Sequence, residues 1–522
     1  MADVVLIRPR GGPAGAEEVT YEHLGLGYLA GYLEQHGVAV DLYDAVLEDC
    51  SIDEIAQRVR TTRPALVGIT VPSQRALPSV SEHALAVKTA SPQTHICIGG
   101  HFPTQVPELL MRDFTFLDSV VRGEGEKPLL ELATRLINGQ PVDGVPSLTH
   151  WRGDEIVSEP LAPTFADIDE IPFPRRRRLP LRMGGVQYAT IVSSRGCDYK
   201  CTFCSIHAFY DSAGLRWRMR SVNNVVREMV ELRERWGCTG FFFADDNFLR
   251  PGAAGLARAL EFRNELRAAK MDDCIIIALL TANAVRDEVI APLVEVGLRG
   301  VFLGIESASP QILKRLRKPS TAAMNGAALR LLGRYGLDVT AGFIMFDPDT
   351  TLDDLRINIT FLRDHLGFLS DTNVIGRLDI YAGTPAHAEF ESRGRLSGSY
   401  LEPQYEFSDA GVDWVYAVVT AVLGRWAEVL ENWTRGPRGR LTSAVPAATQ
   451  GALWRQRTQF MLEVLETLVN HAAHGHLVPP HQAVELLVEP VDRVMQSLTR
   501  PLGVEPPPPV AAVRPLAAAA AG

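Results

Sequence analysis

The stretch Ser194–Cys204 reads SRGCDYKCTFC, and it places Cys197, Cys201 and Cys204 in a C-x3-C-x2-C pattern. Three thiolates within eight residues can hold three corners of a metal site. In a four-iron cluster held this way one iron stays open for another ligand, and an open iron can perform chemistry. The triplet therefore predicts a reactive iron–sulfur site.

Zinc is the alternative metal for this stretch. His207 follows Cys204 by three residues, so a Cys3His site is conceivable. Structural zinc sites are closed and tetrahedral, and a small module usually carries them. The iron–sulfur site is favoured because the triplet directly follows a predicted strand of a βα barrel, where working residues gather.

Length and composition restrict the class of protein. At 522 residues the chain is too long for one core, so two or three domains are expected. Hydrophobic residues make up 46% and charged residues 22%, as in soluble globular enzymes. A formal charge of −10 disfavours a nucleic-acid partner, which would require a basic face.

Three further features bear on localisation. No apolar run reaches the ~18 residues that a membrane helix needs, so no membrane span is expected. The chain starts with an alternating strand instead of a signal peptide. Seven cysteines are an odd number, which suits a reduced compartment. We therefore expect a cytoplasmic protein.

Residues 1–140 alternate strand and helix in the pattern of a doubly wound, Rossmann-like α/β domain. Ligands of such sheets bind at the carboxyl ends of the strands. The predicted strands are Val4–Ile7, Val38–Tyr43, Leu66–Val71, His95–Ile98 and Ser119–Val121. The loops expected at the binding edge contain Thr70, Ser73, Gly99, Gly100, Gly123 and Glu124.

Residues 141–185 are predicted to form a hairpin and a linker. Ser147–Trp151 and Glu155–Ser158 flank the turn residues Arg152-Gly153-Asp154, which indicates a small hairpin. The run Arg175–Arg178 lies among prolines and is interpreted as a solvated linker.

Residues 186–390 repeat the strand–helix alternation with longer units, which predicts a partial (β/α)6 barrel. The cysteine triplet lies just after the first strand, at the carboxyl end where barrel active sites form. The predicted strands are Tyr188–Ser193, Gly240–Ala244, Ile275–Leu280, Gly300–Gly304, Val339–Met345 and Asn373–Ile380.

The remaining chain is predicted in two parts. Residues 391–500 are expected to be helical and to lie on the substrate side of the barrel. Residues 501–522 are rich in proline and alanine, and a disordered tail is expected.

The pattern C-x3-C-x-aromatic-C after a first barrel strand resembles the radical S-adenosylmethionine (radical SAM) superfamily. The resemblance implies that Cys197, Cys201 and Cys204 carry a [4Fe-4S] cluster and that SAM chelates the fourth iron. The reduced cluster would then cleave SAM to a 5′-deoxyadenosyl radical that abstracts a hydrogen atom. Phe203 matches the aromatic position near the adenine.

Two further barrel segments fit this resemblance. Asp245 and Asp246 end the second strand, where the superfamily holds the methionine amino group, although helix capping is an alternative role. Glu306 and Ser307 end the fourth strand and resemble the segment that meets the SAM ribose and carboxylate.

The pattern Arg218-x-Arg220-Ser221 is frequent in one branch of the superfamily. Surface charge and helix capping explain these three residues equally well.

The N-terminal domain resembles the cobalamin-binding domain that is fused to class B radical SAM enzymes. The resemblance rests on HLGLGYLA at residues 23–30 and on glycines that would let the backbone approach a bulky ligand. It implies cobalamin contacts in the three loops at the binding edge, namely at Thr70, Ser73, Gly99, Gly100, Gly123 and Glu124.

One departure concerns the cobalt. Cobalamin domains often carry Asp-x-His-x-x-Gly, whose histidine binds cobalt from below, and the loop Asp44–Asp49 has no histidine. Many radical SAM relatives lack that histidine too. His101 could serve as a ligand, although a loop histidine more often has a structural role.

The resemblance implies a cobalamin-dependent radical SAM methyltransferase. It would methylate a carbon of a small-molecule substrate, preferably a natural-product intermediate, through methylcobalamin and a 5′-deoxyadenosyl radical. A flavodoxin or ferredoxin would supply electrons. The alternatives are a cobalamin-binding radical SAM enzyme that performs cyclisation, ring rearrangement or oxygen insertion, and a non-catalytic zinc-binding scaffold.

Overall fold

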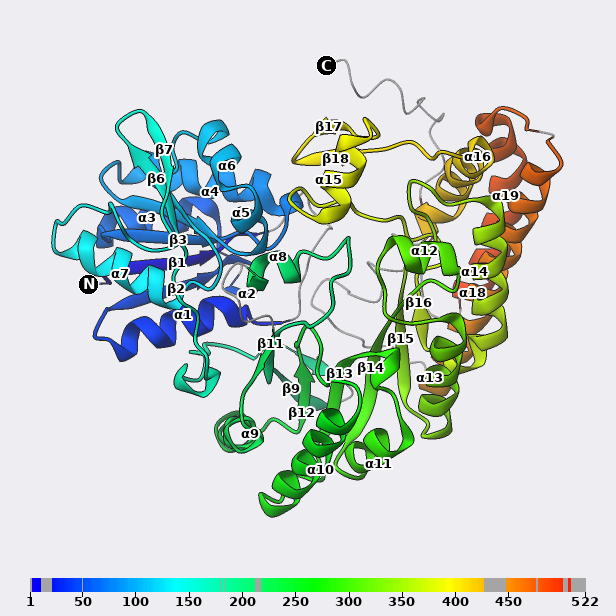
Figure 1. Cartoon of the computed structure of the whole chain (residues 1–522), viewed down its shortest axis with the longest axis horizontal. Helices are drawn as coiled ribbons and strands as arrows, with labels where there is room; N and C mark the ends of the chain where they lie inside the picture. The colour runs from blue at the N-terminus through cyan, green and yellow to red at the C-terminus, as the bar shows by residue number, and fades with distance from the viewer. Residues whose placement is uncertain are drawn as a thin grey trace.

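Two parallel sheets lie side by side, and a helical region covers the far side of the second sheet (Figure 1). The structure is a computed structural model. It describes residues 2–10, 21–48, 50–179, 181–183, 185–211, 217–426, 447–475, 477–500 and 506–507. The tail predicted for residues 501–522 lies outside the described residues except at 506–507.

The first sheet is doubly wound, as predicted. Its parallel strands follow the order β2-β1-β3-β4-β5. The order reverses between β1 and β3, and such a reversal leaves a crevice at the carboxyl edge of a sheet. The strands are β1 (Val4–Arg8), β2 (Val40–Asp44), β3 (Leu66–Thr70), β4 (His95–Gly99) and β5 (Ser119–Val121).

Alternation along β1 explains how helices cover both faces of this sheet. Val4 and Leu6 pack in one core with α1 (Leu24–Gln35) and α7 (Glu126–Ile137). Val5 and Ile7 point to the opposite face, where α3 (Ile52–Thr62) and α4 (Leu77–Ala90) lie. Both faces of the strands are buried, which is why they read as continuous apolar runs.

The predicted hairpin forms, but it belongs to the first sheet. Strand β6 (Leu148–Arg152) pairs antiparallel with β5, and β7 (Glu155–Ser158) pairs with β6. The N-terminal sheet therefore extends to Ser158, beyond the expected boundary at residue 140.

The expectation of a solvated linker at Arg175–Arg178 holds only in part, because Arg177 and Arg178 are exposed whereas Arg175 and Arg176 are not. The Arg176 side chain is only 5% exposed and forms ion pairs with Glu22 and Glu228. Arg175 donates to the carbonyl of Val40 in β2 at 2.8 Å. The run thus joins the N-terminal domain to the second sheet, and its partners lie far away in the sequence.

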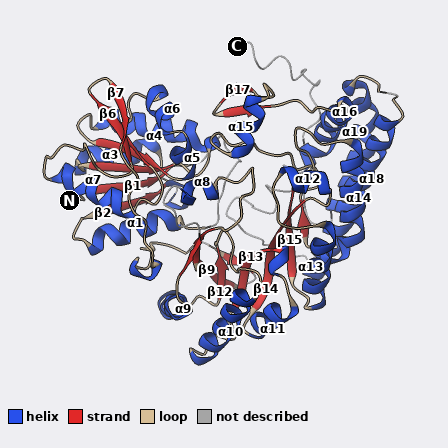
Figure 2. Cartoon of the chain, viewed as in Figure 1, coloured by secondary structure: helices blue, strands red, loops and turns tan. Residues whose placement is uncertain are grey.

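The second sheet is an open barrel of six parallel strands in the order β16-β15-β14-β13-β12-β9, edged by the antiparallel β8. Figure 2 shows β9, β12, β13, β14 and β15 of this sheet. The strands are β8 (Arg182–Met183), β9 (Val186–Ile191), β12 (Gly240–Phe243), β13 (Ile275–Thr281), β14 (Leu298–Glu306), β15 (Asp338–Phe343) and β16 (Asp371–Thr372). The helices that follow its strands include α9 (Val222–Trp236), α10 (Ala253–Ala268), α11 (Asp287–Glu295), α13 (Ala322–Arg334) and α14 (Leu352–His365).

The sixth barrel strand differs from the prediction of Asn373–Ile380. The strand β16 is short and ends at Thr372. The Asn373 side chain then accepts a hydrogen bond from the Ile375 backbone, which turns the chain. Beyond that turn Arg377 forms an isolated bridge with Phe346.

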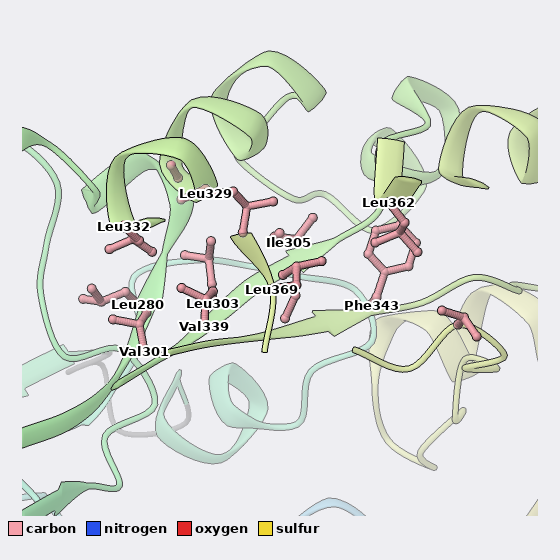
Figure 3. Packing of buried hydrophobic residues seen from close by; sticks show 14 of the residues in the cluster. Leu280, Val301, Leu303, Ile305, Leu329, Leu332, Val339, Phe343, Leu362 and Leu369 are labelled. Atoms are coloured by element: carbon pink, nitrogen blue, oxygen red, sulfur yellow. The ribbon is translucent and has the colours of Figure 1, made fainter. Parts of the chain in front are cut away.

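Outward and inward residues of the barrel strands have different surroundings. Val301, Leu303 and Ile305 of β14 belong to the buried core that includes Leu329 and Leu332 of α13 (Figure 3). In contrast, Phe302 on the opposite face of β14 is 39% exposed. Phe302 therefore faces the inner wall of the open barrel and is not part of the buried core.

The described C-terminal residues are mostly helical from Ala410 on, as expected, but before them β17 (Ser397–Ser399) pairs antiparallel with β18 (Glu402–Gln404). The helices are α16 (Ala410–Val419), α18 (Ala447–Ala473) and α19 (Pro480–Thr499). Helix α18 packs against α14 and α16, and its buried Leu462, Leu465 and Val469 join the barrel core. Its described part therefore extends the outer layer of the barrel. None of the described helices is long and apolar enough to cross a membrane.

Candidate cofactor site

The cysteine loop begins on a two-stranded ribbon beside the barrel. Strand β10 (Ser194–Gly196) pairs antiparallel with β11 (Trp217–Met219). Gly196 then adopts φ +83°, a conformation that favours glycine, and the chain turns into the loop. The Thr202 backbone donates to the carbonyl of Leu316 at 3.0 Å, which fixes the middle of the loop.

The three thiols are close enough for their charges to interact. Burial, together with the charges of neighbouring thiols, raises the pKa of Cys197 to about 11 and that of Cys204 to about 12. Burial also raises the pKa of Cys201, while Lys318 lowers it. Without a metal the thiols are therefore neutral, and a bound cation would be needed to hold them as thiolates.

The spacing of the thiols favours a cluster over zinc. A tetrahedral zinc ion with Zn–S bonds of about 2.3 Å would bring its sulfur ligands to about 3.8 Å from one another. Among the described residues, Cys197, Cys201 and Cys204 do not form a group whose ligand atoms all lie within 4.8 Å, with or without His207. Cysteines of a cluster lie farther apart because each binds its own iron.

The two predicted aspartates differ in what they face. Asp245 is 1% exposed, and its Oδ1 accepts hydrogen bonds from the Ser193 backbone and side chain at 3.0 and 2.9 Å. Asp246 accepts from the backbone of Gly196 at 3.0 Å and lines a cavity. Burial raises the pKa of Asp246 to about 7. Of the two aspartates, Asp246 is the one that faces the cavity. Neither aspartate is the N-cap of a described helix, so the capping alternative does not apply.

Glu306 and Ser307 also separate. Glu306 has φ +62° at the end of β14, and its Oε1 accepts a hydrogen bond from Lys318 Nζ at 2.8 Å. Ser307 is fully buried, and its hydroxyl donates to Asn358 of α14 at 2.9 Å. The structure therefore leaves Glu306 beside the cysteines, while the Ser307 hydroxyl is used within the core.

Lys318 was not expected from the sequence. Its side chain is 7% exposed, and its charge acts on Cys197 and Cys201 as well as on Glu306. Gly304 provides the space, because a Cβ there would lie 2.9 Å from Lys318 Nζ. No spacing or motif announces this lysine in the sequence.

A cavity of about 360 Å³ lies between the N-terminal domain and the cysteine loop. Its inner part is apolar and lies between the first sheet and the helices α1 and α7. The residues that line this part are Leu6, Leu26, Leu29, Gly68, Cys97, Val121 and Leu129. Its mouth is formed on the barrel side by Val192, Ser194, Arg195, Ala244 and Asp246. Both halves of the chain therefore contribute to one cavity.

The predicted cobalamin contacts can be compared with this cavity. Five of them line it, namely Thr70, Gly99, Gly100, Gly123 and Glu124. Gly100 has φ +121°, and a Cβ there would lie 2.8 Å from the Val71 carbonyl, so no other residue fits without strain. Ser73 does not line the cavity and is half-buried beside it.

Two histidines line the same cavity. Burial lowers the pKa of His23 to about 3 and that of His101 to about 4, so both are neutral. His23 Nε2 lies 3.3 Å from the Thr70 hydroxyl. The His101 ring stacks on Phe209 of α8 (Ile206–Asp211), the helix that follows Cys204. His101 Nδ1 is buried without a hydrogen-bond partner.

The Arg-x-Arg-Ser segment is largely internal. Arg218 and Arg220 are buried and form ion pairs with Glu124 and Glu228, so the surface-charge interpretation is wrong. The Ser221 side chain caps α9 by accepting from the Asn224 backbone, so the capping interpretation is confirmed for the serine.

The fold and the site together define a class of protein. It has two domains, and the crevice of the doubly wound first domain faces a loop with three cysteines at the mouth of an open βα barrel. Residues 17–133 match the family described as B12 binding domain, and residues 191–362 match the radical SAM superfamily. An uncharacterized methyltransferase of Pyrococcus horikoshii is 31% identical over 344 residues, which cover 65% of this chain and 72% of that protein. The chain therefore belongs to the radical SAM proteins that carry a B12-binding domain.

Further similarities agree with this family. The anaerobic magnesium-protoporphyrin IX monomethyl ester cyclase of Rubrivivax gelatinosus is 27% identical over 378 residues, covering 69% of this chain and 65% of the cyclase. The chain thus spans slightly less than two thirds of that relative.

Two solved structures share the fold. The cobalamin-dependent radical enzyme OxsB, solved with aqua-cobalamin and S-adenosylmethionine, superposes with a TM-score of 0.74 over 96% of this chain and 80% of its own, at 18% identity. TsrM from Kitasatospora setae, solved with cobalamin and a [4Fe-4S] cluster, gives 0.65 over 91% and 100%, at 18% identity.

The cofactor prediction is thus confirmed at the level of the family, whose chemistry uses a [4Fe-4S] cluster, SAM and cobalamin. The residues present also fit these groups. The cavity is mostly apolar and is cradled by glycines, as a large organic cofactor requires. The three thiols lie on one loop and are close enough for their charges to interact.

Proposed function

We propose that this protein is a cobalamin-dependent radical SAM methyltransferase that methylates a carbon of a small organic molecule. One observation carries the proposal. A single cavity is lined by the crevice of the B12-binding domain and by Ser194, Arg195 and Asp246, which flank the cysteine loop. A methyl carrier held in that crevice would thus face the site where the radical forms.

Each cofactor has a set of residues that would hold it. Cys197, Cys201 and Cys204 would bind three irons, and Phe203 would lie near the adenine of SAM. The cobalamin contacts are proposed at the cavity-lining residues Thr70, Gly99, Gly100, Gly123 and Glu124. When bound, the cofactors would supply a 5′-deoxyadenosyl radical and a methyl group carried on cobalt.

The polar groups of the chain have positioning roles in this proposal. Asp246 would accept an N–H of the SAM amino group, and its buried setting would strengthen that hydrogen bond. Glu306, held by Lys318, would orient the ribose or the carboxylate. The apolar inner wall of the cavity would keep water from the reacting groups.

The substrate is proposed to be a natural-product intermediate with an apolar carbon framework. The support is the inner wall of the open barrel, where Phe302 is 39% exposed and Leu279 is half-buried. A flavodoxin or ferredoxin is proposed as the reductant, because the cluster needs one electron for each radical.

Non-methylating chemistry is the second candidate, since one relative is named as a cyclase. The products of SAM separate the two. A methyltransferase of this kind must form S-adenosylhomocysteine and 5′-deoxyadenosine in roughly equal amounts, because one SAM gives the methyl group and another gives the radical. A cyclase forms no S-adenosylhomocysteine.

The test begins with anaerobically purified protein. We expect about four irons and one cobalamin per chain, with the brown absorbance of a cluster. The triple variant C197A/C201A/C204A should lose the iron and keep cobalamin. The matched control is C274A, since Cys274 is a buried thiol away from the loop. Zinc in place of iron, or a cluster that survives the triple substitution, would refute the proposal.

A further inference from the structure

The ribbon that leads into the cysteine loop carries two arginines directly opposite each other. Arg195 of β10 pairs with Arg218 of β11 in the antiparallel register. Their side chains are 11% and 5% exposed. Like charges in this arrangement repel each other unless a carboxylate lies between them.

The required carboxylates come from the other domain. Glu124 accepts from Arg195 at 2.8 Å and from both terminal nitrogens of Arg218 at 2.8 and 2.9 Å. Glu126 accepts from Arg195 at 2.7 Å. Burial would raise the pKa of Glu124, but the guanidinium groups outweigh it and hold the pKa below its usual range.

This ion-pair network adjoins both cofactor sites. Glu124, Glu126 and Arg195 all line the cavity. Arg195 is separated from Cys197 by Gly196 alone, and its guanidinium lies 5.0 Å from the ring centre of Tyr28, another cavity residue. A shift of the cavity wall would therefore move the start of the cysteine loop, because buried ion pairs tolerate little separation.

We propose that Arg195 is a positioning residue that couples the cavity of the B12-binding domain to the cysteine loop through Glu124 and Glu126. This inference rests on the proposed function, since it takes cobalamin and the cluster as the two ligands. Cluster binding orders the residues after Gly196, and so it orders the cavity wall that Arg195 holds. The second cofactor then meets a wall already in place.

The experiment measures the affinity of hydroxocobalamin for protein with a reconstituted cluster and for cluster-free protein. We expect the cluster to change the dissociation constant of the wild type by at least about five-fold, as coupled sites commonly do. In R195M the ratio of the two constants should fall to about one. E126Q removes the charge of one partner of Arg195 but keeps the shape of that side chain. The ratio of the two dissociation constants in E126Q should therefore lie between those of the wild type and R195M.

The matched control is R250M. Arg250 pairs with Asp198, the residue after Cys197, at 2.9 Å, but both side chains are exposed and belong to the barrel half. R250M should keep the wild-type ratio. The inference is overturned if R195M and E126Q keep the wild-type ratio, or if the wild type binds both cofactors with a ratio of one. Failure of the wild type to bind either cofactor would instead refute the proposed function itself.

Discussion

Asp246 is a carboxylate that the fold holds at the cavity while burial raises its pKa to about 7. An unfolded aspartate titrates near 3.9, so the folded chain keeps a proton between about pH 4 and 7 that the unfolded chain has lost. The stability that this group contributes is therefore present at low pH and declines as the pH rises through that window.

We predict that D246N removes this decline from the cofactor-free protein. Between about pH 5.5 and 8, the unfolding free energy of the wild type should fall by ~2 kcal/mol more than that of D246N. Urea denaturation at the two pH values measures the difference. Parallel pH profiles of the two proteins would show that Asp246 is ionised throughout.

Single residues of the site were predictable only where local sequence decides them. The cysteines and Asp246 follow strands whose ends are clear from the apolar pattern. Ser307 follows a strand too, but its hydroxyl turns toward Asn358, which lies 51 positions later. The direction of a side chain at a strand end depends on such distant partners, and Lys318 was missed for the same reason.

At the scale of elements, the apolar inner part of the cavity, here called the slot, depends on a glycine in β3. Gly68 lines the slot, and a Cβ there would lie 2.9 Å from a flexible end of Leu6. We predict that G68L fills the slot and abolishes cobalamin binding, while the iron content stays at the wild-type value. Equilibrium dialysis with hydroxocobalamin and an iron assay give both quantities.

G68A is the matched control, because the Leu6 side chain can move aside for one methyl group. It should weaken cobalamin binding far less than G68L. If G68L binds cobalamin as the wild type does, the cofactor does not enter between the sheet and α1.

The arginine run gives a second prediction for a segment. Arg176 bridges Glu22 and Glu228 with nearly all of its side chain buried, whereas Arg178 is exposed and donates to the Leu47 carbonyl. We predict that R176M lowers the unfolding free energy by about 3–5 kcal/mol, because it leaves the buried Glu22 without its arginine and leaves Glu228 with Arg220 as its remaining cation. R178M should change it little. Denaturant unfolding of both variants tests this, and equal losses would contradict it.

Most elements were predictable because their partners are near in sequence or their burial is complete. The strands of the first sheet match their predicted ranges within two residues, since apolar runs bounded by turns are a local signal. The sixth barrel strand was wrong because the Asn373 turn interrupts an otherwise strand-like run. The burial of Arg176 was missed because its partner Glu228 lies 52 positions away in the sequence.

At the scale of the whole molecule, ion pairs join the two halves, and so do hydrogen bonds and a ring contact made by Gln74 and Tyr400. Gln74 of the first domain donates to the carbonyl of Ile380 and accepts from the backbone of Ala382, both at 3.4 Å. Tyr400 donates to Asp113 at 2.8 Å and stacks on Phe102. Domains that share only small polar contacts usually move independently. Here the buried ion pairs of Arg176 and Arg195 also connect the two halves, and so we expect the halves to be held more rigidly.

This union predicts that the two halves unfold together. In scanning calorimetry the wild type should give one transition whose calorimetric and van't Hoff enthalpies agree. Hydroxocobalamin at 100 times its dissociation constant should add about 2.7 kcal/mol to the unfolding free energy and shift that whole transition to higher temperature.

In the double variant R176M/R195M, two buried arginine links between the halves are lost. We expect its scan to split into two transitions, of which cobalamin shifts only the one that belongs to the B12-binding domain. Two transitions in the wild type would mean that the buried ion pairs do not unite the halves, and the coupling assigned to Arg195 would then lack its structural basis.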